Sequence, residues 1–374
     1  MKILFIHLDD GINTCPPAIN VIENLLDQGH EVFLVSYSVD ELDPEVLSNN
    51  KFKYYDLGKR KNPSNNIQKY LARYHVRQRI RKFIARCIKN YDLVWTTSEI
   101  TIREVGPVLF KAKKHVMQLM ELARVVPVFG GHEQFYVELE PFAQKAFKVV
   151  VPEINRAYIV KTWWHLNTLP TVLPNKPYKT EIKSISNEAQ KIINIVKQER
   201  RKIILYQGGF TADRKFDQFA EAVDKLGDDY CLYFMGKDND YRKEICLKYP
   251  FIKYVGALKP PEHLLIAKYA YVGILTYMPV KDGFHSELNA LYCAPNKSFE
   301  YALCNLPMIG TDVPGLQEIF HEYNVGVCIK EESADGVIEA IRHVDQHYEE
   351  MKQNCSKYFD SVDLKEIVRK IVFE

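Results

Sequence analysis

The feature that most constrains the fold is an alternation between short, uninterrupted apolar runs and helical stretches. The chain begins with the strand-like run KILFIHL, a loop containing Gly and Pro, the helical stretch AINVIENLLDQ and a second strand-like run, HEVFLVS. Such continuously apolar strands are typical of a parallel sheet whose two faces are both covered. The sequence therefore predicts doubly wound α/β structure with right-handed crossovers.

This alternation occurs twice, on either side of residues 171–200, which contain prolines, lysines and serines with little periodicity and predict a linker or domain edge. A length of 374 residues suits two domains, which we place at residues 1–172 and 173–350. Strands are expected at 52–56, 91–96, 115–119, 147–151, 202–206, 230–235, 252–256, 271–277, 307–311 and 325–329, and helices at 215–226, 261–269, 297–304, 314–321 and 333–348. Two such domains facing a central cleft would bind ligands at the carboxyl ends of their strands.

The composition excludes several classes of protein. No run of apolar residues approaches the length of a membrane-spanning helix, and the amino terminus lacks the pattern of a cleaved signal peptide. The eight cysteines are scattered, without a CxxC pair or a Cys/His cluster at zinc spacing. We therefore expect a cytoplasmic protein with reduced thiols and no structural metal.

A basic stretch stands out against a nearly neutral chain. Residues 59–89 contain eleven Lys or Arg and no acid, whereas the whole chain has a net charge of +2. Apolar residues from Ile67 to Ile88 recur near helical spacing, which predicts an amphipathic helix with its apolar face in the core. The excess of cations suggests either a polyprenyl-diphosphate acceptor or an anionic membrane surface, the latter contacted by Arg77, Arg79, Arg81 and Lys82 from a peripheral position at the inner face of the membrane. A solvated helix face is the alternative. No nucleic-acid-binding motif accompanies the stretch, so nucleic acid is not an expected partner.

The segment PNKSFE at 295–300 is the most informative for chemistry. It ends a loop and begins a short helix, with Asn296 as the expected N-cap. The first-turn amides, the helix dipole and the Lys297 ammonium could together bind a diphosphate. The Glu300 carboxylate, one turn further on, could accept hydrogen bonds from two vicinal hydroxyls of a ribose. A helix whose glutamate merely favours the positive end of the dipole is the alternative.

A second segment, YQGGF at 206–210, runs from a strand into a Gly-Gly turn. Glycine permits close approach of the backbone to a ligand, and Arg214 and Lys215 follow at the start of the next helix. A guanidinium together with an ammonium suits a pair of phosphates. A tight turn followed by solvated cations is the alternative.

The sequence resembles the retaining GT-B glycosyltransferases of the family 4 type over essentially its whole length. The motifs that carry the resemblance are GHEV at 29–32, VVVP at 149–152, LPN at 173–175, YQGGF at 206–210, MG at 235–236, YVGAL at 254–258 and, most specifically, PNKSFEYALCNLP at 295–307. The resemblance implies two Rossmann-like domains facing a central cleft. It also implies that a C-terminal helix, at about 362–372, packs back on the first domain.

The resemblance also implies roles for individual residues. Glu300 matches the ribose-binding glutamate, and Arg214 and Lys297 match the groups that neutralise the leaving diphosphate. Further contacts to the nucleotide-sugar are expected from Asp10, Gly11, Gly208, Gly209, Lys215, Tyr254, Val255, Gly256, Ala257, Asn289, Asn296 and Ser298. Contacts to the sugar or the acceptor are expected from Glu121, His132, His285 and Glu287.

Three positions depart from the family pattern. Tyr292 stands where an acidic residue is common, Gly209 where an arginine is common, and Met120 where a histidine is common. Glu287 and Asn289 are candidate substitutes for the missing sugar contacts. Catalysis can proceed without the histidine when the departing diphosphate itself accepts the proton, so that the protein mainly positions and stabilises charge.

We therefore expect a retaining, metal-independent hexosyltransferase without a cofactor. Its donor would be a UDP- or GDP-sugar and its acceptor a hydroxyl of a glycan or a lipid-linked glycan in bacterial surface-polysaccharide synthesis. Two alternatives stay open: a nucleotide-sugar 2-epimerase of the same architecture, and a catalytically degenerate GT-B subunit that binds without turnover. Release of UDP or GDP by the transferase, but not by the epimerase, separates the first two.

Overall fold

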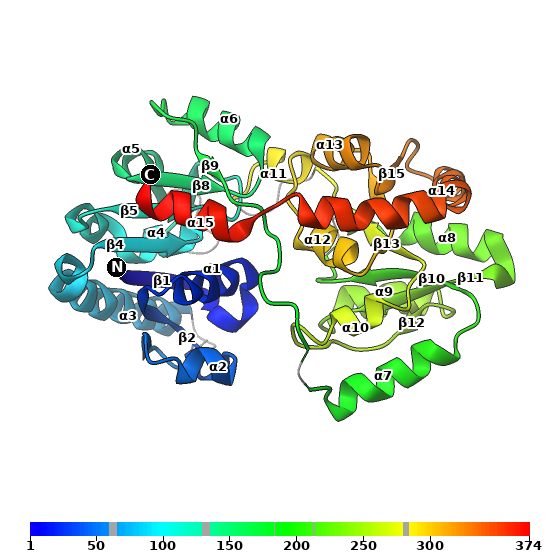
Figure 1. Cartoon of the computed structure of the whole chain (residues 1–374), viewed down its shortest axis with the longest axis horizontal. Helices are drawn as coiled ribbons and strands as arrows, with labels where there is room; N and C mark the ends of the chain where they lie inside the picture. The colour runs from blue at the N-terminus through cyan, green and yellow to red at the C-terminus, as the bar shows by residue number, and fades with distance from the viewer. Residues whose placement is uncertain (60–65, 129–134, 183, 212–213, 280–283) are drawn as a thin grey trace. The chain divides into compact units, whose positions relative to one another are not determined.

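The protein consists of two compact units (Figure 1). The structure is a computed structural model that describes residues 1–59, 66–128, 135–182, 184–211, 214–279 and 284–374. Unit 1 comprises Met1–Lys179, Lys281–Asn289 and Asp363–Glu374, and unit 2 comprises Thr180–Val280 and Ala290–Val362. The chain therefore leaves and re-enters both units.

Unit 1 is built on a seven-stranded parallel sheet in the order β3-β2-β1-β4-β5-β8-β9. Its strands are β1 (Lys2–Gly11), β2 (Glu31–Tyr37), β3 (Phe52–Asp56), β4 (Leu93–Thr97), β5 (His115–Gln118), β8 (Lys148–Val151) and β9 (Thr171–Val172). Residues Ile3 to Ile6 are fully buried, as expected for a strand covered on both faces.

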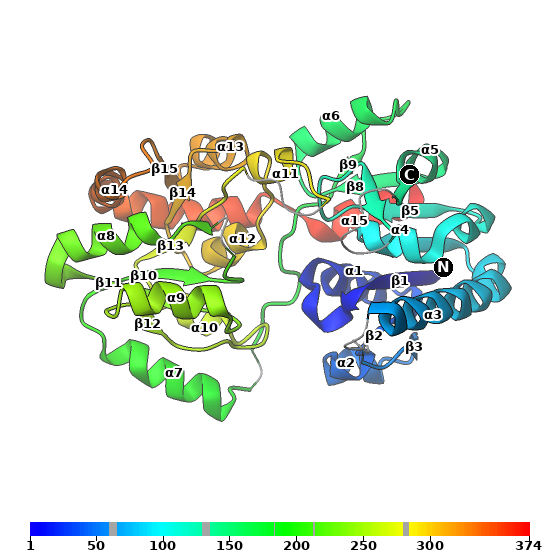
Figure 2. The same ribbon diagram turned by 180° about the vertical axis from the view of Figure 1, so that it is seen from behind.

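Helices cover both faces of this sheet. They are α1 (Pro16–Asp27), α2 (Pro44–Ser48), α3 (Asn66–Cys87), α4 (Glu99–Val105), α5 (Glu140–Lys145), α6 (Ile154–Trp163) and α15 (Leu364–Phe373). Helix α15 packs beside α1, where Gln28 donates to the Lys365 carbonyl at 3.1 Å. Helix α3 lies on the opposite face, which is turned to the viewer in Figure 2. A short antiparallel hairpin, β6 (Val125–Pro127) and β7 (Tyr136–Glu138), stands apart from the sheet.

Unit 2 repeats the same design with a six-stranded parallel sheet in the order β12-β11-β10-β13-β14-β15. Its strands are β10 (Lys202–Gln207), β11 (Tyr230–Met235), β12 (Lys253–Tyr254), β13 (Val272–Leu275), β14 (Met308–Thr311) and β15 (Gly326–Ile329). Its helices are α7 (Asn187–Gln198), α8 (Asp217–Leu226), α9 (Asp240–Lys248), α10 (Leu264–Ala267), α11 (Leu288–Leu291, which begins in unit 1), α12 (Asn296–Leu303), α13 (Pro314–Tyr323) and α14 (Ala334–Asp360).

Consecutive residues of β10 alternate between two apolar cores. Ile203 and Leu205 join one core and Ile204 and Tyr206 the other, so both faces of the sheet are covered. In each unit the strand order reverses beside the first strand, between β1 and β4 and between β10 and β13. This is the order of the doubly wound nucleotide-binding fold, which binds ligands at that switch point. The predicted α/β architecture is confirmed.

The structure differs from the sequence predictions at several elements. Residues 171–200 are not merely a linker, because they form β9 and α7, whose buried Ala189, Ile192 and Val196 follow helical spacing. The helix expected at 261–269 is reduced to α10, since Pro260 and Pro261 cannot supply backbone donors. The helix expected at 333–348 continues to Asp360, past non-helical dihedral angles at His347.

Candidate functional site

The candidate donor site of unit 2 lies at its switch point, where β10 and β13 end side by side. Strand β10 leads into Gly208 and Gly209, and β13 leads into Thr276 and Tyr277. Parallel strands that diverge to opposite sides leave a crevice at their carboxyl ends. The sheet therefore brings the Gly-Gly turn next to the segment that follows β13.

Gly208 has a steric reason to be glycine. Its φ is +143°, and a Cβ built there would lie 3.0 Å from Nζ of Lys297. A Cβ on Gly236, after β11, would overlap the Gly208 carbonyl. Both glycines thus allow the turn, the neighbouring strand end and the Lys297 ammonium to pack closely. At Gly209 a Cβ would meet nothing, and the Gly209 carbonyl accepts a hydrogen bond from the Tyr206 hydroxyl at 2.6 Å.

Helix α12 carries the PNKSFE segment and begins one residue earlier than expected. The predicted N-cap role of Asn296 is wrong, because Pro295 is the N-cap residue and Asn296 is already helical. Proline has no backbone donor to lose at this end. The buried Ser298 hydroxyl donates to the Pro295 carbonyl at 2.9 Å and lies 3.1 Å from the Tyr358 hydroxyl, so this side chain braces the loop before α12.

Glu300 is a buried carboxylate held by two side chains from other elements. Its Oε2 accepts a hydrogen bond from Nε2 of Gln207 at 2.8 Å, and its Oε1 lies 3.3 Å from Nε2 of His263. Burial acts to raise the pKa of Glu300, but His263, the Lys297 charge and Gln207 together hold it below its ordinary value. Glu300 is therefore an ionised acceptor at neutral pH.

Two polar atoms beside Glu300 have no hydrogen-bond partner among the described residues. They are Oε1 of Gln207 and Nδ1 of His263, and both are buried. A buried acceptor without a partner is costly, so natural proteins seldom keep one without a reason. Oε1 of Gln207 is thus an acceptor without a partner among the described residues, next to the Glu300 carboxylate. Such a pair suits a ligand that donates through hydroxyl groups.

Lys297 and Arg214 converge on the ring of Tyr277. The Arg214 guanidinium lies 4.3 Å from the ring centroid and the Lys297 ammonium 5.8 Å. Arg214 is fixed by Thr276, whose carbonyl accepts from Nη1 of Arg214 at 2.7 Å and whose hydroxyl donates to the Arg214 carbonyl. Two cations beside one ring favour an anion with two charged groups, such as a diphosphate.

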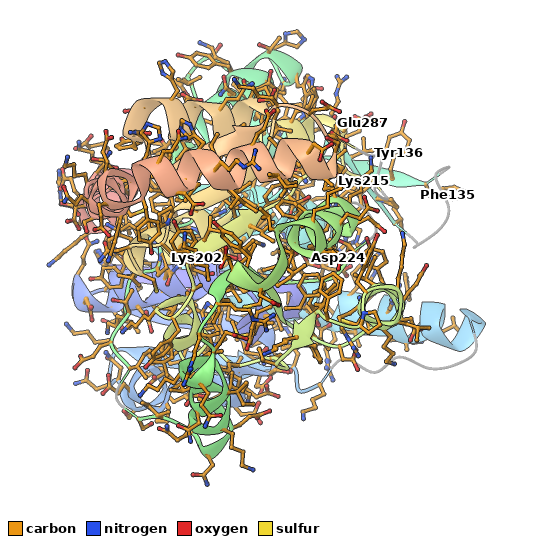
Figure 3. All side chains as sticks on the ribbon, turned by 90° about the vertical axis from the view of Figure 1, so that its right-hand side faces the viewer. Phe135, Tyr136, Lys202, Lys215, Asp224 and Glu287 are labelled. Atoms are coloured by element: carbon orange, nitrogen blue, oxygen red, sulfur yellow. The ribbon has the colours of Figure 1, made fainter. Side chains whose placement is uncertain are left out.

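Other residues expected in the donor site lie around this centre or away from it. Lys215, labelled in Figure 3, forms an exposed ion pair with Glu332 at 3.6 Å and does not join the two cations at Tyr277. Tyr254 ends β12, and its hydroxyl donates to the Gly236 carbonyl at 2.8 Å. The Val255 amide donates to the Phe234 carbonyl at 3.0 Å, which extends the pairing of β12 with β11 by one residue. Gly256, at φ +87°, accepts through its carbonyl from the Gly236 amide at 2.8 Å. Ala257, the next residue, is exposed.

Unit 1 has its own cluster at the carboxyl ends of β1, β4 and β5. Asp10 is exposed, and buried Gly11 ends β1. Ser98, at φ +71°, donates to Asp9 at 3.2 Å and caps α4. The buried Glu99 carboxylate accepts from the backbone amides of Met120 and Glu121 at 2.9 and 3.0 Å. Glu99 therefore fixes the loop that follows β5.

The segment 284–289 docks on this loop within unit 1. The Asn289 side chain donates to the Glu121 carboxylate at 2.7 Å and accepts from the Leu122 amide at 2.8 Å. Buried Arg156 donates to the carbonyls of Met120 and Asn289, both at 2.9 Å. Asn289, expected as a nucleotide-sugar contact, thus uses both side-chain polar atoms inside unit 1, where it orients Glu121.

The remaining predicted contacts are dispersed. His285 packs beside Phe284, with 4.3 Å between the ring centroids, and Glu287 is exposed (Figure 3). His132 lies outside the described residues. No group of three His, Cys, Asp or Glu side chains suitable for a metal occurs in the part of the chain that the structure describes.

Four residues that the sequence did not single out help to build these sites. Gln207 and His263 hold Glu300, while Glu99 and Arg156 hold the 119–122 loop. Gln207 directly precedes the Gly-Gly turn, and this position in the sequence could have identified it as a site residue. The other three have no such signal, because each reaches its partner only through the tertiary fold.

We expect Glu99→Gln to raise the stability of unit 1 at alkaline pH. Burial, and then the charge of Glu121, raises the pKa of Glu99 to about 8. The folded state therefore keeps a proton that the unfolded state releases. The free energy of unfolding falls by up to about 1.4 kcal/mol per pH unit as the pH rises from the ordinary pKa of a glutamate toward 8. Glutamine stays neutral and can still accept from both amides.

Thermal unfolding checks this prediction. The variant and the parent chain should unfold at similar temperatures near about pH 5, and the variant at a higher temperature near about pH 8.5. Exposed Glu138→Gln is the matched control in the same unit, and its unfolding temperature should follow that of the parent chain at both pH values. An equal difference at both pH values would contradict a protonated Glu99.

Known proteins are similar to this chain in part of its sequence and in its whole fold. Residues 201–346 match the family described as glycosyl transferases group 1. A search of curated protein sequences finds no match. Among solved structures, a sucrose-phosphate synthase from Thermosynechococcus elongatus is similar over 99% of this chain and 97% of its own, with a TM-score of 0.67 and 16% identity.

Two further solved structures are similar over nearly the full length of both chains. One is Anabaena Alr3699/HepE in complex with UDP-glucose, with a TM-score of 0.65, 12% identity and coverage of 99% and 98%. The other is WaaG, described as a glycosyltransferase involved in lipopolysaccharide biosynthesis, with a TM-score of 0.60, 14% identity and coverage of 100% and 98%. At these identities the likeness establishes the fold.

Proposed function

We propose that this chain moves a hexose-type sugar from a nucleoside-diphosphate donor to a hydroxyl acceptor. Its residues 201–346 match the glycosyl transferases group 1 family, and its fold is that of the GT-B glycosyltransferases. One observation carries the proposal. A buried, ionised carboxylate, Glu300, and two cations, Lys297 and Arg214, surround the switch point of the unit 2 sheet. Such a group of charges is suited to a nucleoside diphosphate.

Each part of the donor has a counterpart in unit 2. The ribose hydroxyls would donate to Glu300 and to the unfilled Oε1 of Gln207, and the diphosphate would lie against Lys297, Arg214 and the first turn of α12. The base would meet the backbone after β12. The complex of Anabaena Alr3699/HepE with UDP-glucose supports a uridine nucleotide, and a GDP-sugar is the other candidate donor.

We propose that transfer proceeds with retention of configuration. The bond between C1 of the sugar and the diphosphate oxygen breaks, and the acceptor oxygen bonds to C1 on the same face. The acceptor proton passes to an oxygen of the departing diphosphate. Lys297 and Arg214 stabilise the negative charge that grows on the diphosphate, so the proposed reaction needs no dedicated base and no metal.

The acceptor would be a glycan or a lipid-linked glycan of a bacterial surface polysaccharide, handled on the cytoplasmic side. The similarity to WaaG supports this class of acceptor. In unit 1, Glu121 would contact the acceptor hydroxyls, because Asn289 and the Glu99-bound loop hold it in place at the end of β5.

The proposal predicts both the products and their stereochemistry. The purified chain, mixed with UDP- or GDP-hexoses and glycan acceptors, should release the free nucleoside diphosphate and form a glycoside with the anomeric configuration of the donor. Nucleotide release is measured by chromatography and the anomer by nuclear magnetic resonance. An inverted product would overturn the retaining mechanism. Conversion of the donor to its 2-epimer without nucleotide release would indicate the epimerase, and donor binding without either reaction the degenerate subunit.

A further inference from the structure

Helix α3 exposes a row of four cations. Arg79, Lys82 and Arg86 are spaced by three and four residues, which places them on one face of the helix, and Lys89 follows in the 3₁₀ turn Ile88–Asn90. All four are exposed, and none forms an ion pair with a residue that the structure describes. We call these four residues the basic row. The sequence of α3 and this turn contains no acid that could neutralise it.

The other cations of this helix that the sequence pointed to have structural partners. Nε of Arg77 lies 2.8 Å from Oε2 of Glu104, and Arg77 is buried. Arg81 donates to the backbone carbonyls of Arg103 and Glu104, both at 2.9 Å. The prediction that Arg77 and Arg81 contact a membrane is therefore wrong, because both serve the packing of α3 on α4.

Arg77 also connects α3 to the hairpin. Its guanidinium donates to the Val128 carbonyl at 3.5 Å, and the Val128 amide donates to the Phe135 carbonyl at 2.8 Å. Phe135 and Tyr136 are 61% and 51% exposed at the edge of unit 1 (Figure 3).

Helix α3 also exposes two large apolar side chains. Leu71 and Tyr74, which the sequence placed in the core, are 47% and 46% exposed. Ile80 and Ile84 supply the buried face of α3 instead, and buried Ile88 continues it in the following 3₁₀ turn. We call Leu71, Tyr74, Phe135 and Tyr136 the apolar group. Within this group, Leu71 lies on the same face of α3 as Lys82, about three turns earlier, whereas Phe135 and Tyr136 belong to the hairpin that Arg77 contacts through Val128.

We infer that this face of unit 1 docks on the surface of an anionic lipid bilayer, beyond the reaction proposed for the chain. The basic row would meet lipid phosphates, and the apolar group would enter the interfacial layer, where aromatic side chains are favoured. Charge complementarity selects this partner, because uncompensated cations beside exposed aromatic and aliphatic side chains match anionic headgroups over acyl chains. No helix among the described residues is long and apolar enough to span a membrane, so docking is peripheral.

Vesicle flotation at low salt tests this inference. The whole chain should float with mixed phosphatidylglycerol–phosphatidylcholine vesicles and remain unbound with phosphatidylcholine alone. Changing the basic row to glutamine (R79Q/K82Q/R86Q/K89Q) should lower the partition coefficient by several hundredfold, at roughly fivefold per cation. The matched control, K191Q/R200Q/K268Q/K330Q, removes the same charge from exposed positions of unit 2 and should float like the parent chain.

The salt dependence of binding and a variant of the apolar group test the inference in a second way. Physiological salt should weaken binding of the parent chain, because it shortens the Debye length to about 8 Å. F135S/Y136S should lower the partition coefficient by about tenfold, since the apolar contribution is not screened. Equal flotation of the basic-row variant and the parent, no flotation at low salt, or displacement from vesicles by equimolar RNA would overturn the inference. Stabilisation by UDP or GDP, measured on all variants, reports on the donor site separately and should not change.

Discussion

Replacing Lys297 by alanine is expected to reduce turnover by roughly 10²- to 10³-fold, the loss typical when one donor to a developing negative charge is removed. The ammonium lies against Gly208 and beside Tyr277, where the proposed diphosphate gains charge as the bond to the sugar breaks. Arg214→Ala should act similarly. Steady-state kinetics should show that kcat falls more than the affinity for the nucleotide-sugar, because the interaction strengthens in the transition state.

The control is Lys330→Ala, which removes an exposed ammonium elsewhere in unit 2 and should leave kcat unchanged. Circular dichroism should establish that the three variants remain folded. If the double variant K297A/R214A turned over like the parent chain, the diphosphate would have to bind elsewhere. A kcat restored by adding a divalent metal would count against neutralisation by these side chains alone.

Replacing Glu300 by glutamine should weaken nucleotide binding by ten- to a hundredfold, since a hydrogen bond to a charged group contributes about 1.5–3 kcal/mol. The fold should persist, because glutamine can keep contacts with Gln207 and His263. Isothermal calorimetry with UDP and GDP measures the effect. The lowered pKa of Glu300 also predicts the pH dependence of binding. Nucleotide affinity should be constant near neutral pH and decline only when acid protonates the carboxylate.

Two variants separate the ribose contact from a general effect of charge. Exposed Glu339→Gln makes the same chemical change in the same unit and should bind nucleotide normally. His263→Gln should give a smaller loss than Glu300→Gln, because His263 orients the carboxylate without itself being the proposed ribose contact. Unchanged affinity of the Glu300 variant would remove the ribose assignment.

The sheets were predictable because each strand carries its own local signal. The runs at 52–56 and 230–235 coincide with β3 and β11. Helix α9 was missed because Ile245 is its only buried residue, which leaves no amphipathic period to detect. Helix α7 has such a period and a Ser186 cap, but the prolines before it suggested a linker. The β6–β7 hairpin has three-residue strands, too short for any pattern.

The candidate site was predictable only where a local motif carried it. Glu300 and Lys297 stand in one run of sequence, and the structure places them at the switch point. Gln207 and His263 reach Glu300 from other elements, so only the sheet order brings them together. The sequence placed both Arg214 and Lys215 at the phosphates, and the structure separates them. The positive φ of Lys215 accompanies a side chain that pairs with Glu332, while Arg214 turns to Tyr277.

The division of unit 1 into three chain segments has a consequence for biosynthesis. Its whole seven-stranded sheet precedes unit 2 in the chain, yet Lys281–Asn289 and Asp363–Glu374 are translated only after most or all of unit 2. Unit 1 is therefore the first to be started and the last to be completed, contrary to the usual order in which amino-terminal domains finish folding during synthesis. A ribosome-bound chain arrested before residue 363 would expose the surface of α1 that later receives α15, and this surface is where a chaperone should act.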